Sequence, residues 1–106
     1  MTDTDKDLLE RAARAVGITL DFTIRGDFPP YYVNERGGHS SWNPLTDDGD
    51  ALRLVVKLGL LVDVTHEATG AQVLNVSFVS ELHNGDPYAA TRRAIVRAAA
   101  ALGDAK

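Results

Sequence analysis

Apolar residues recur at the spacing of an α-helix in three stretches of the chain. The first stretch spans residues 5–16, carries its apolar side chains on one stripe and ends before Gly17. Thr4 and Asp7, three positions apart, resemble a capping box at its start. The stripe predicted to be buried consists of Leu8, Leu9, Ala12, Ala13 and Val16.

The second helical stretch follows the turn-forming segment 42–44. Pro44 disfavours helical backbone at the residue before it and so delays the helix. Oxygens of residues 46–48 can accept the free amides of the first turn, and Gly59 can adopt the left-handed conformation that ends a helix. The predicted buried face consists of Leu52, Val55, Val56 and Leu58.

The third helical stretch begins at Asp86 and Pro87, which suit the N-cap and the first helical position. It is rich in alanine, runs to about Leu102 and is predicted to end at Gly103. Its predicted core stripe consists of Ala90, Ala94, Ile95, Ala98 and Leu102.

Alternation of apolar and polar residues predicts strands elsewhere. Residues 18–25 alternate cleanly, so one face of that strand should be buried and the other solvated. Residues 60–66 and 72–80 alternate on either side of a glycine-containing turn at residues 67–71, which is typical of a β-hairpin. The inward positions are predicted to be Leu60, Val62, Val64, Leu74, Val76 and Phe78.

These elements give the order α-β-α-β-β-α in a single domain spanning residues 1–106. Strands that are not strictly interleaved with helices indicate the α+β class. We therefore expect a small, mainly antiparallel sheet with helices packed on it. The polar residues of the opposite parity indicate that one sheet face is less well covered than the other.

Residues 26–44 form a long segment rich in glycine, proline and aromatic residues. A loop of this length in a small domain usually covers the core, binds a partner or contacts a second subunit. Residues 31–33 are also compatible with a short edge strand. Trp42 is predicted to anchor the loop on the core, whereas Phe28, Tyr31 and Tyr32 are candidates for contact with a partner.

Composition narrows the possible classes of protein. Hydrophobic residues make up 44% of the 106 positions, which is enough for a folded core. The absence of cysteine excludes disulfides and thiolate metal sites and fits a reducing cytoplasm. A net charge of −4 argues against nucleic-acid binding over a broad surface. Neither a membrane span nor a signal peptide is predicted, so we expect no membrane contact.

Three arginines on the last helical stretch, Arg92, Arg93 and Arg97, are candidate ligand-binding residues. Arg93 and Arg97 are one helical turn apart, and a pair of arginines can hold a phosphate bidentately. This pattern suggests a small anionic ligand such as a nucleotide. The ordinary interpretation is a solvated face that is ion-paired with some of the 15 acidic residues.

The histidines and the acidic cluster give weaker signals. His39 lies beside Ser41, which suggests a hydrolase, but the sequence contains neither a nucleophile elbow nor a placed acid. His66 and His83 fit surface or edge positions. The aspartates of segment 47–50 have no calcium-loop pattern and suit the positive end of a helix dipole. We therefore assign no metal, no cofactor and no catalytic residue.

Two segments, residues 42–60 and 86–100, together resemble a known family. Shared features are a Trp-Asn-Pro segment, an acidic helix start before an apolar helix, and a terminal helix rich in arginine and alanine. The chain resembles the phage ABA-sandwich domain family, small proteins of tailed bacteriophages and prophages that are similar to short proteins of the lambdoid nin region. The resemblance implies an α-β-α layered sandwich and transfers no catalytic or binding residues.

We therefore expect a non-enzymatic phage or prophage accessory protein in the bacterial cytoplasm. It should act by protein–protein contact with a phage or host partner and with copies of itself, because of its aromatic loop and its exposed sheet edge. The first alternative is a nucleotide-binding protein that uses Arg93 and Arg97. The second is a hydrolase that uses His39 and Ser41.

Overall fold

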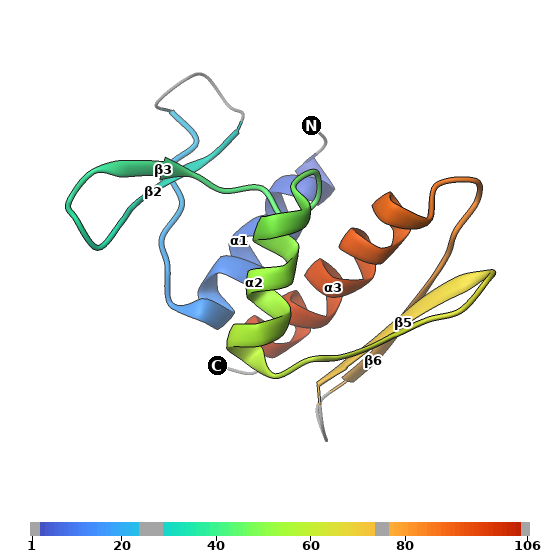
Figure 1. Ribbon diagram of the computed structural model, residues 1–106. Helices are drawn as coiled ribbons and strands as arrows, with labels where there is room; N and C mark the ends of the chain where they lie inside the picture. Colours follow the sequence, from blue (N-terminus) through green and yellow to red (C-terminus); the bar gives the residue numbers. More distant parts are fainter. Residues whose placement is uncertain (1–2, 24–28, 74–76, 105–106) are drawn as a thin grey trace.

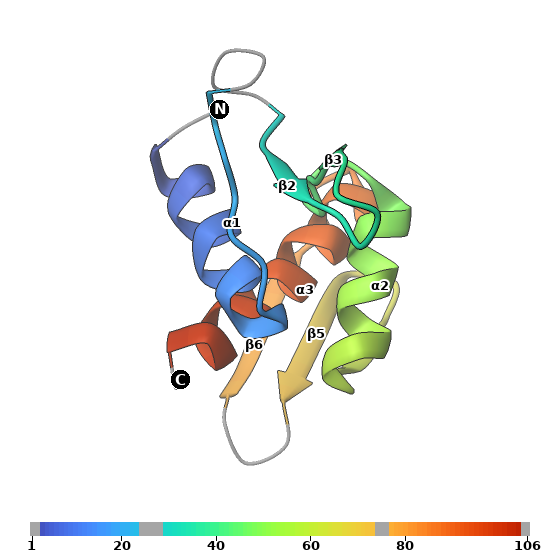
Figure 2. The same cartoon turned by 90° about the vertical axis from the view of Figure 1, so that its left-hand side faces the viewer.

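The alanine-rich helix α3 (Pro87–Asp104) lies at the centre of the structure (Figure 1). The computed structural model describes residues 3–23, 29–73 and 77–104. Helices α1 (Asp3–Val16) and α2 (Asp48–Leu58) pack on one side of α3, and a three-stranded sheet packs on its other side (Figure 2). Because α3 has neighbours on both sides, it is buried well beyond a single stripe.

Small side chains let α1 and α3 approach closely. Ala12 and Ala13 of α1 and Ala99 and Ala100 of α3 are all essentially buried. Near the end of α3, a Cβ atom at Gly103 would lie 2.0 Å from the backbone carbonyl oxygen of Arg11. Gly103 therefore lies inside the helix and in the contact, which corrects the prediction that it ends α3.

The three-stranded sheet consists of β4 (Leu61–Val64), β5 (Ala68–Val73) and β6 (Ser77–Leu82), antiparallel and in that order. Alternate residues of β5 are buried beneath α3, namely Thr69, Ala71 and Val73. No described helix covers the opposite face of this sheet (Figure 1).

A separate hairpin joins β2 (Tyr31–Val33) to β3 (His39–Ser41) and projects on the other side of α2 from the sheet (Figure 1). Its turn is held by Asn34, whose side-chain oxygen accepts the amides of Arg36 at 3.0 Å and Gly38 at 3.1 Å. The alternative of a strand at residues 31–33 is thus confirmed. Trp42, which follows β3, is buried in the core as predicted.

The strand predicted over residues 18–25 does not form in the described part, residues 18–23. Asp21 and Tyr31 make only an isolated bridge, with backbone N···O distances of 2.7 and 2.9 Å. Asp21 then accepts both the amide and the hydroxyl of Thr23, at 2.8 and 2.6 Å. A side chain that binds the nearby backbone in this way competes with a strand ladder, so the extended segment does not continue.

The region predicted as one hairpin contains three strands. The predicted turn at residues 67–71 lies mostly within β5, because the chain has already turned at Thr65, whose amide donates to Ala68 O at 2.9 Å. This shift reverses the predicted orientation of Phe78, which pairs with Gln72 and points away from α3. Leu74 and Val76 lie outside the described residues.

The α+β class with antiparallel sheets is confirmed, while the order of elements is α-β-β-α-β-β-β-α. In place of helices on both sides of a sheet, the layers are the sheet, then α3, then α1 and α2 (Figure 2).

The predicted ends of α2 and the predicted start of α3 are confirmed. Asp47 caps α2 by accepting the Asp50 amide at 2.8 Å, and Gly59 ends it at φ 66°. Asp86 accepts the Ala89 amide at 3.0 Å, and Pro87 is the first residue of α3. The predicted capping box at Thr4 is wrong, because α1 already begins at Asp3. None of the described helices combines the length and apolarity needed to cross a membrane.

The contact at Gly103 can be tested by the substitution Gly103→Ala. We expect a loss of about 1–3 kcal/mol in the free energy of unfolding, because the new methyl group meets backbone that cannot rotate away. Urea unfolding followed by far-UV circular dichroism measures it. Gly49→Ala in α2 is the matched control. There the methyl group meets only the ends of the Arg53 and Asp47 side chains, at 3.2 Å, and alanine has a higher helix propensity than glycine. Equal stability of the two variants would contradict the close packing.

The C-terminal end of α3 is also tied to α1 by Arg11, whose Nε donates to Asp104 Oδ1 at 2.8 Å. This hydrogen bond holds the pKa of the Asp104 carboxyl below its ordinary value. Because an unfolded aspartate titrates near about pH 3.9, the unfolded state binds the proton more tightly. The contribution of Asp104 to stability is therefore present above that pH and is lost as the pH falls below it.

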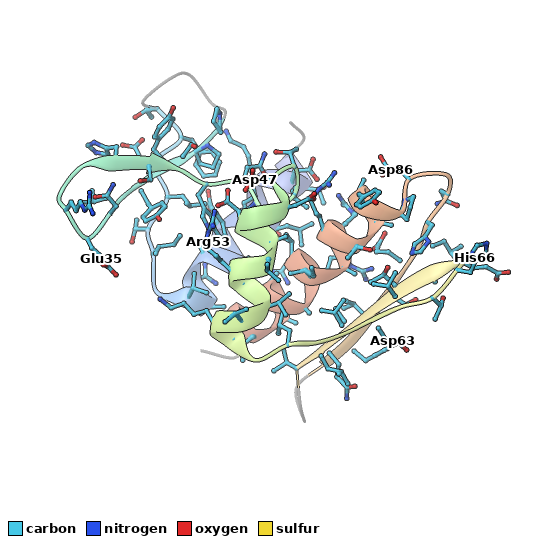
Figure 3. All side chains as sticks on the ribbon, viewed as in Figure 1. Glu35, Asp47, Arg53, Asp63, His66 and Asp86 are labelled. Carbon is cyan, nitrogen blue, oxygen red and sulfur yellow. The ribbon has the colours of Figure 1, made fainter. Side chains whose placement is uncertain are left out.

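Asp104→Asn should accordingly lower the urea midpoint at pH 7, and the difference from the parent protein should shrink as the pH falls below about 3.9. Glu35→Gln, at the tip of the β2–β3 hairpin (Figure 3), provides the control for loss of one exposed carboxylate. If the difference in urea midpoint between Asp104→Asn and the parent protein stayed the same at low pH, the stabilisation would not come from the ionised Asp104 carboxylate.

Candidate functional site

A groove of about 420 Å³ lies where α2, β4 and the start of α3 meet. It combines segments from three parts of the chain that are far apart in sequence. Its lining is almost entirely apolar and includes Ala51, Leu52, Val64, Tyr88 and Ile95. A concave apolar site with a few polar groups is the usual form of a binding site in a small domain.

Large apolar side chains stand exposed around the groove. Leu52, Val64 and Tyr88 line it, Val56 lies one turn beyond Leu52 on α2, and each of the four is between 56% and 75% exposed. Monomeric proteins rarely leave such side chains together in water unless the surface binds something. The cluster therefore marks the groove as the candidate functional site.

The helix α2 supplies this surface because it has two apolar faces. Residues follow one another by about 100° around a helix. Ala51 and Leu54 are buried, whereas Leu52 and Val56 share the opposite side and are exposed. The prediction that Leu52 and Val56 belong to the buried face is therefore wrong. Ala51 and Leu54 therefore pack α2 against the core, while Leu52 and Val56 remain exposed for contact with a partner.

An ion pair closes one end of the groove. Arg92 of α3 donates to the carboxylate of Asp48 at 2.7 Å and to the carbonyl oxygen of Leu45 at 2.9 Å. Arg92 is mostly covered, whereas Asp48 remains exposed at the start of α2. Arg92 thus joins α3 to the start of α2 and leaves a carboxylate at the rim.

A hydrogen-bonded network lies behind the groove. The fully buried hydroxyl of Thr69 lies 2.8 Å from the hydroxyl of Thr91 and 2.9 Å from Nε2 of His83. Thr91 also lines the groove, so the network positions its wall. His83, predicted as a surface or edge residue, is half-buried. The sequence pattern did not indicate Thr69, because it predicts a turn at residues 67–71, whereas Thr69 is a buried residue of β5.

The other two candidate arginines lie with separate carboxylates. Arg93 donates to Asp5 of α1 at 3.2 Å. Arg97 pairs with Glu81 of β6 and donates to the carbonyl oxygen of Ser80 at 3.2 Å. All three candidate arginines therefore connect α3 to three different neighbours, which is the arrangement expected of structural ion pairs.

Of the candidate aromatic residues, the two that the structure describes, Tyr31 and Tyr32, do not line the groove. Phe28 lies outside the described residues. Tyr31 pairs with Ser41 in the hairpin, and Tyr32 packs against the core. The structure thus places Tyr31 and Tyr32 in the projecting hairpin and Arg92 in the groove.

The residues of the hydrolase alternative lie in open solvent. His39 and Ser41 are exposed positions of β3. Asp21 is also on this hairpin side, and its pKa is lowered chiefly by the hydroxyl and amide of Thr23. An exposed serine and histidine lack the water-excluding pocket in which such chemistry is effective.

The acidic cluster at the start of α2 is occupied by structural contacts. Asp47 caps the helix, and Asp50 accepts the amide of Asn43 at 2.9 Å and an N–H of Arg53 at 2.9 Å. Figure 3 shows Asp47 and Arg53 near the strands of the hairpin. Within the described ranges, no three His, Asp or Glu side chains are placed to hold a metal ion.

Comparisons of the chain with protein-family models, with curated proteins and with solved structures found no match.

The network behind the groove predicts a cost for removing one hydroxyl. Thr69→Val keeps the side-chain shape but leaves His83 and Thr91 without their shared partner, so we expect a loss of about 1–3 kcal/mol in the free energy of unfolding. Chemical unfolding measures it. Thr19→Val, at an exposed position, should change stability by less than about 0.5 kcal/mol. Equal effects at the two sites would contradict the role of the network.

Proposed function

We propose that this protein is a non-enzymatic binding protein that acts by protein–protein contact through the groove between α2, β4 and α3. The observation that carries the proposal is the group of exposed apolar side chains around the groove, namely Leu52, Val56, Val64 and Tyr88. Removal of apolar surface from water favours association by roughly 25 cal/mol for each Å², before the entropic cost of association is subtracted. Tyrosine is one of the residues that most often contribute strongly to binding in protein–protein interfaces, and Tyr88 lines the groove.

The charges near the groove favour a basic partner. Asp48 remains exposed at one end of the groove, and Asp86 is exposed directly before Pro87, which lines it. Arg92 is mostly covered by its own contacts. We therefore propose that the partner inserts apolar side chains that are flanked by lysine or arginine, because such charges complement the rim and speed association.

The biological setting is part of the proposal. The resemblance of residues 42–60 and 86–100 to the phage ABA-sandwich domain family supports an accessory protein of a phage or prophage. The absence of cysteine fits the cytoplasm of a bacterial host. We also propose that the protein associates with copies of itself.

The two alternatives have less support. A nucleotide held by Arg93 and Arg97 would have to displace carboxylates of α1 and β6 at the same time. A hydrolase would have to work with His39 and Ser41 exposed on one strand. No specific observation favours either over binding at the groove.

Capture of partners from a bacterial lysate tests the proposal. Tagged wild-type protein and the variants Leu52→Glu and Val33→Glu would be compared by quantitative mass spectrometry. Val33 is the matched control because it is 64% exposed on the hairpin, against 61% for Leu52 in the groove. We expect proteins that are enriched with the wild type and with Val33→Glu to fall at least about tenfold with Leu52→Glu, a loss typical of an interface hot spot.

Two results would contradict this assignment. If Val33→Glu rather than Leu52→Glu abolishes capture, the contact surface is the β2–β3 hairpin. If neither substitution changes the set of captured proteins, the groove is not a binding site. Circular dichroism of each variant would establish that the fold is retained.

A further inference from the structure

The sheet face opposite α3 is a second apolar surface, separate from the groove. Strand alternation and register place its residues side by side in two rows across β4, β5 and β6 and a third row across β5 and β6. We call it the open face, because no described helix covers it (Figure 1). It consists of Leu61 and Asp63 of β4, Ala68, Gly70 and Gln72 of β5, and Phe78, Ser80 and Leu82 of β6.

The open face is unusually apolar for a sheet surface in water. Leu61, Phe78 and Leu82 are each about two-thirds exposed, at 65–66%. Asp63, which points away from α3 in Figure 3, is the only charged residue of the face. The solvated face of an antiparallel sheet is normally polar, so this composition indicates that another surface covers it.

Phe78 and Gly70 give the face a shape suited to close packing. The Phe78 ring lies over Gly70, where a Cβ atom would be only 3.0 Å from Cε2 of the ring. With no side chain at Gly70, the ring lies low across the central strand. Two sheets that pack face to face are about 10 Å apart, which leaves room for a ring from each.

We propose that a second copy of this chain covers the open face, related by a two-fold axis that lies between the two sheets and runs parallel to their strands. This inference rests on the self-association in the proposed function and identifies its surface. The groove uses the other side of β4 and remains free for a different partner.

Charge and register favour this axis. An axis parallel to the strands places β4 of one copy opposite β6 of the other and keeps each row in register. Asp63 and Ser80 belong to the same row, since both are aligned with Gly70. The Asp63 carboxylate would therefore face a Ser80 hydroxyl that can donate a hydrogen bond to it.

The same axis also brings Leu61 and Phe78 of the two copies together. Leu61 and Phe78 also share a row, because both are aligned with Gln72. Each Leu61 would therefore face a Phe78 of the second copy. The other in-plane axis, perpendicular to the strands, would place β4 opposite β4 and bring the two Asp63 carboxylates together, which is costly in a desolvated contact.

The size of the open face limits the strength of the dimer. Three strands about 4.8 Å apart, two of six residues and β4 of four, give a face of at most roughly 15 by 20 Å. This is less than the ~800 Å² per partner that a standard stable interface buries. We therefore expect a dimer that dissociates on dilution, in the micromolar range.

Sedimentation velocity over about 1–500 µM tests the inference. The wild type should change from monomer to dimer across this range, and Leu52→Glu in the groove should behave as the wild type does. Phe78→Glu and, as a second variant, Leu61→Glu should remain monomeric throughout, because each residue faces the other across the proposed contact. Both positions are two-thirds exposed, so the fold should be kept, and circular dichroism would verify it.

Ser80 tests the axis. Ser80→Lys should lower the concentration at half-dimerisation by about tenfold, because each lysine would face Asp63 of the other copy. Ser80→Asp should raise it by a similar factor. With the perpendicular axis, β6 lies opposite β6, so the two introduced lysines would face each other and weaken the dimer. Weakening by Ser80→Lys would therefore overturn the proposed axis.

The remaining outcomes separate this inference from the proposed function. If the wild type stays monomeric, or if Phe78→Glu dimerises as the wild type does, the open face is not a dimer interface. If Leu52→Glu abolishes the dimer while Phe78→Glu does not, self-association uses the groove, and the inference fails although action by protein contact stands.

Discussion

The close approach of α1 to α3 is the contact on which the other packing depends. Gly103 meets the carbonyl of Arg11, and alanines line both helices along the contact. Only small side chains allow this distance. Since α3 also meets the sheet and α2, it needs small residues on several sides. Its neighbours supply large core side chains such as Leu9, Leu54 and Trp42, and α3 adds Ile95 and Val96.

Most side chains of α3 are small, and its long side chains are arginines that reach neighbouring elements. Arg92, Arg93 and Arg97 each reach a different neighbour, at α2, α1 and β6. Exposed ion pairs contribute little stability individually. Each pair nevertheless joins α3 to a different element, and Arg92 lies at the wall of the groove.

This central helix also explains why two apolar surfaces remain. Because all described helices stack on one side of the sheet, its other side carries Leu61, Phe78 and Leu82 without cover. Because α2 reaches α3 with one of its two apolar faces, Leu52 and Val56 remain outside. Both proposals follow from this one-sided arrangement, and the strand β4 separates the two surfaces.

The sequence by itself determined the helices and most of their ends, because capping and helical periodicity involve residues within about one turn of each other. Asp47 and Asp86 could be assigned on that basis. It did not determine the register of the strands, since a shift of one residue reverses which side chains face the core, as it did at Phe78. The groove was beyond sequence reasoning for a related reason. Val64 and Tyr88 share a surface with α2 only once β4 and α3 have packed beside it.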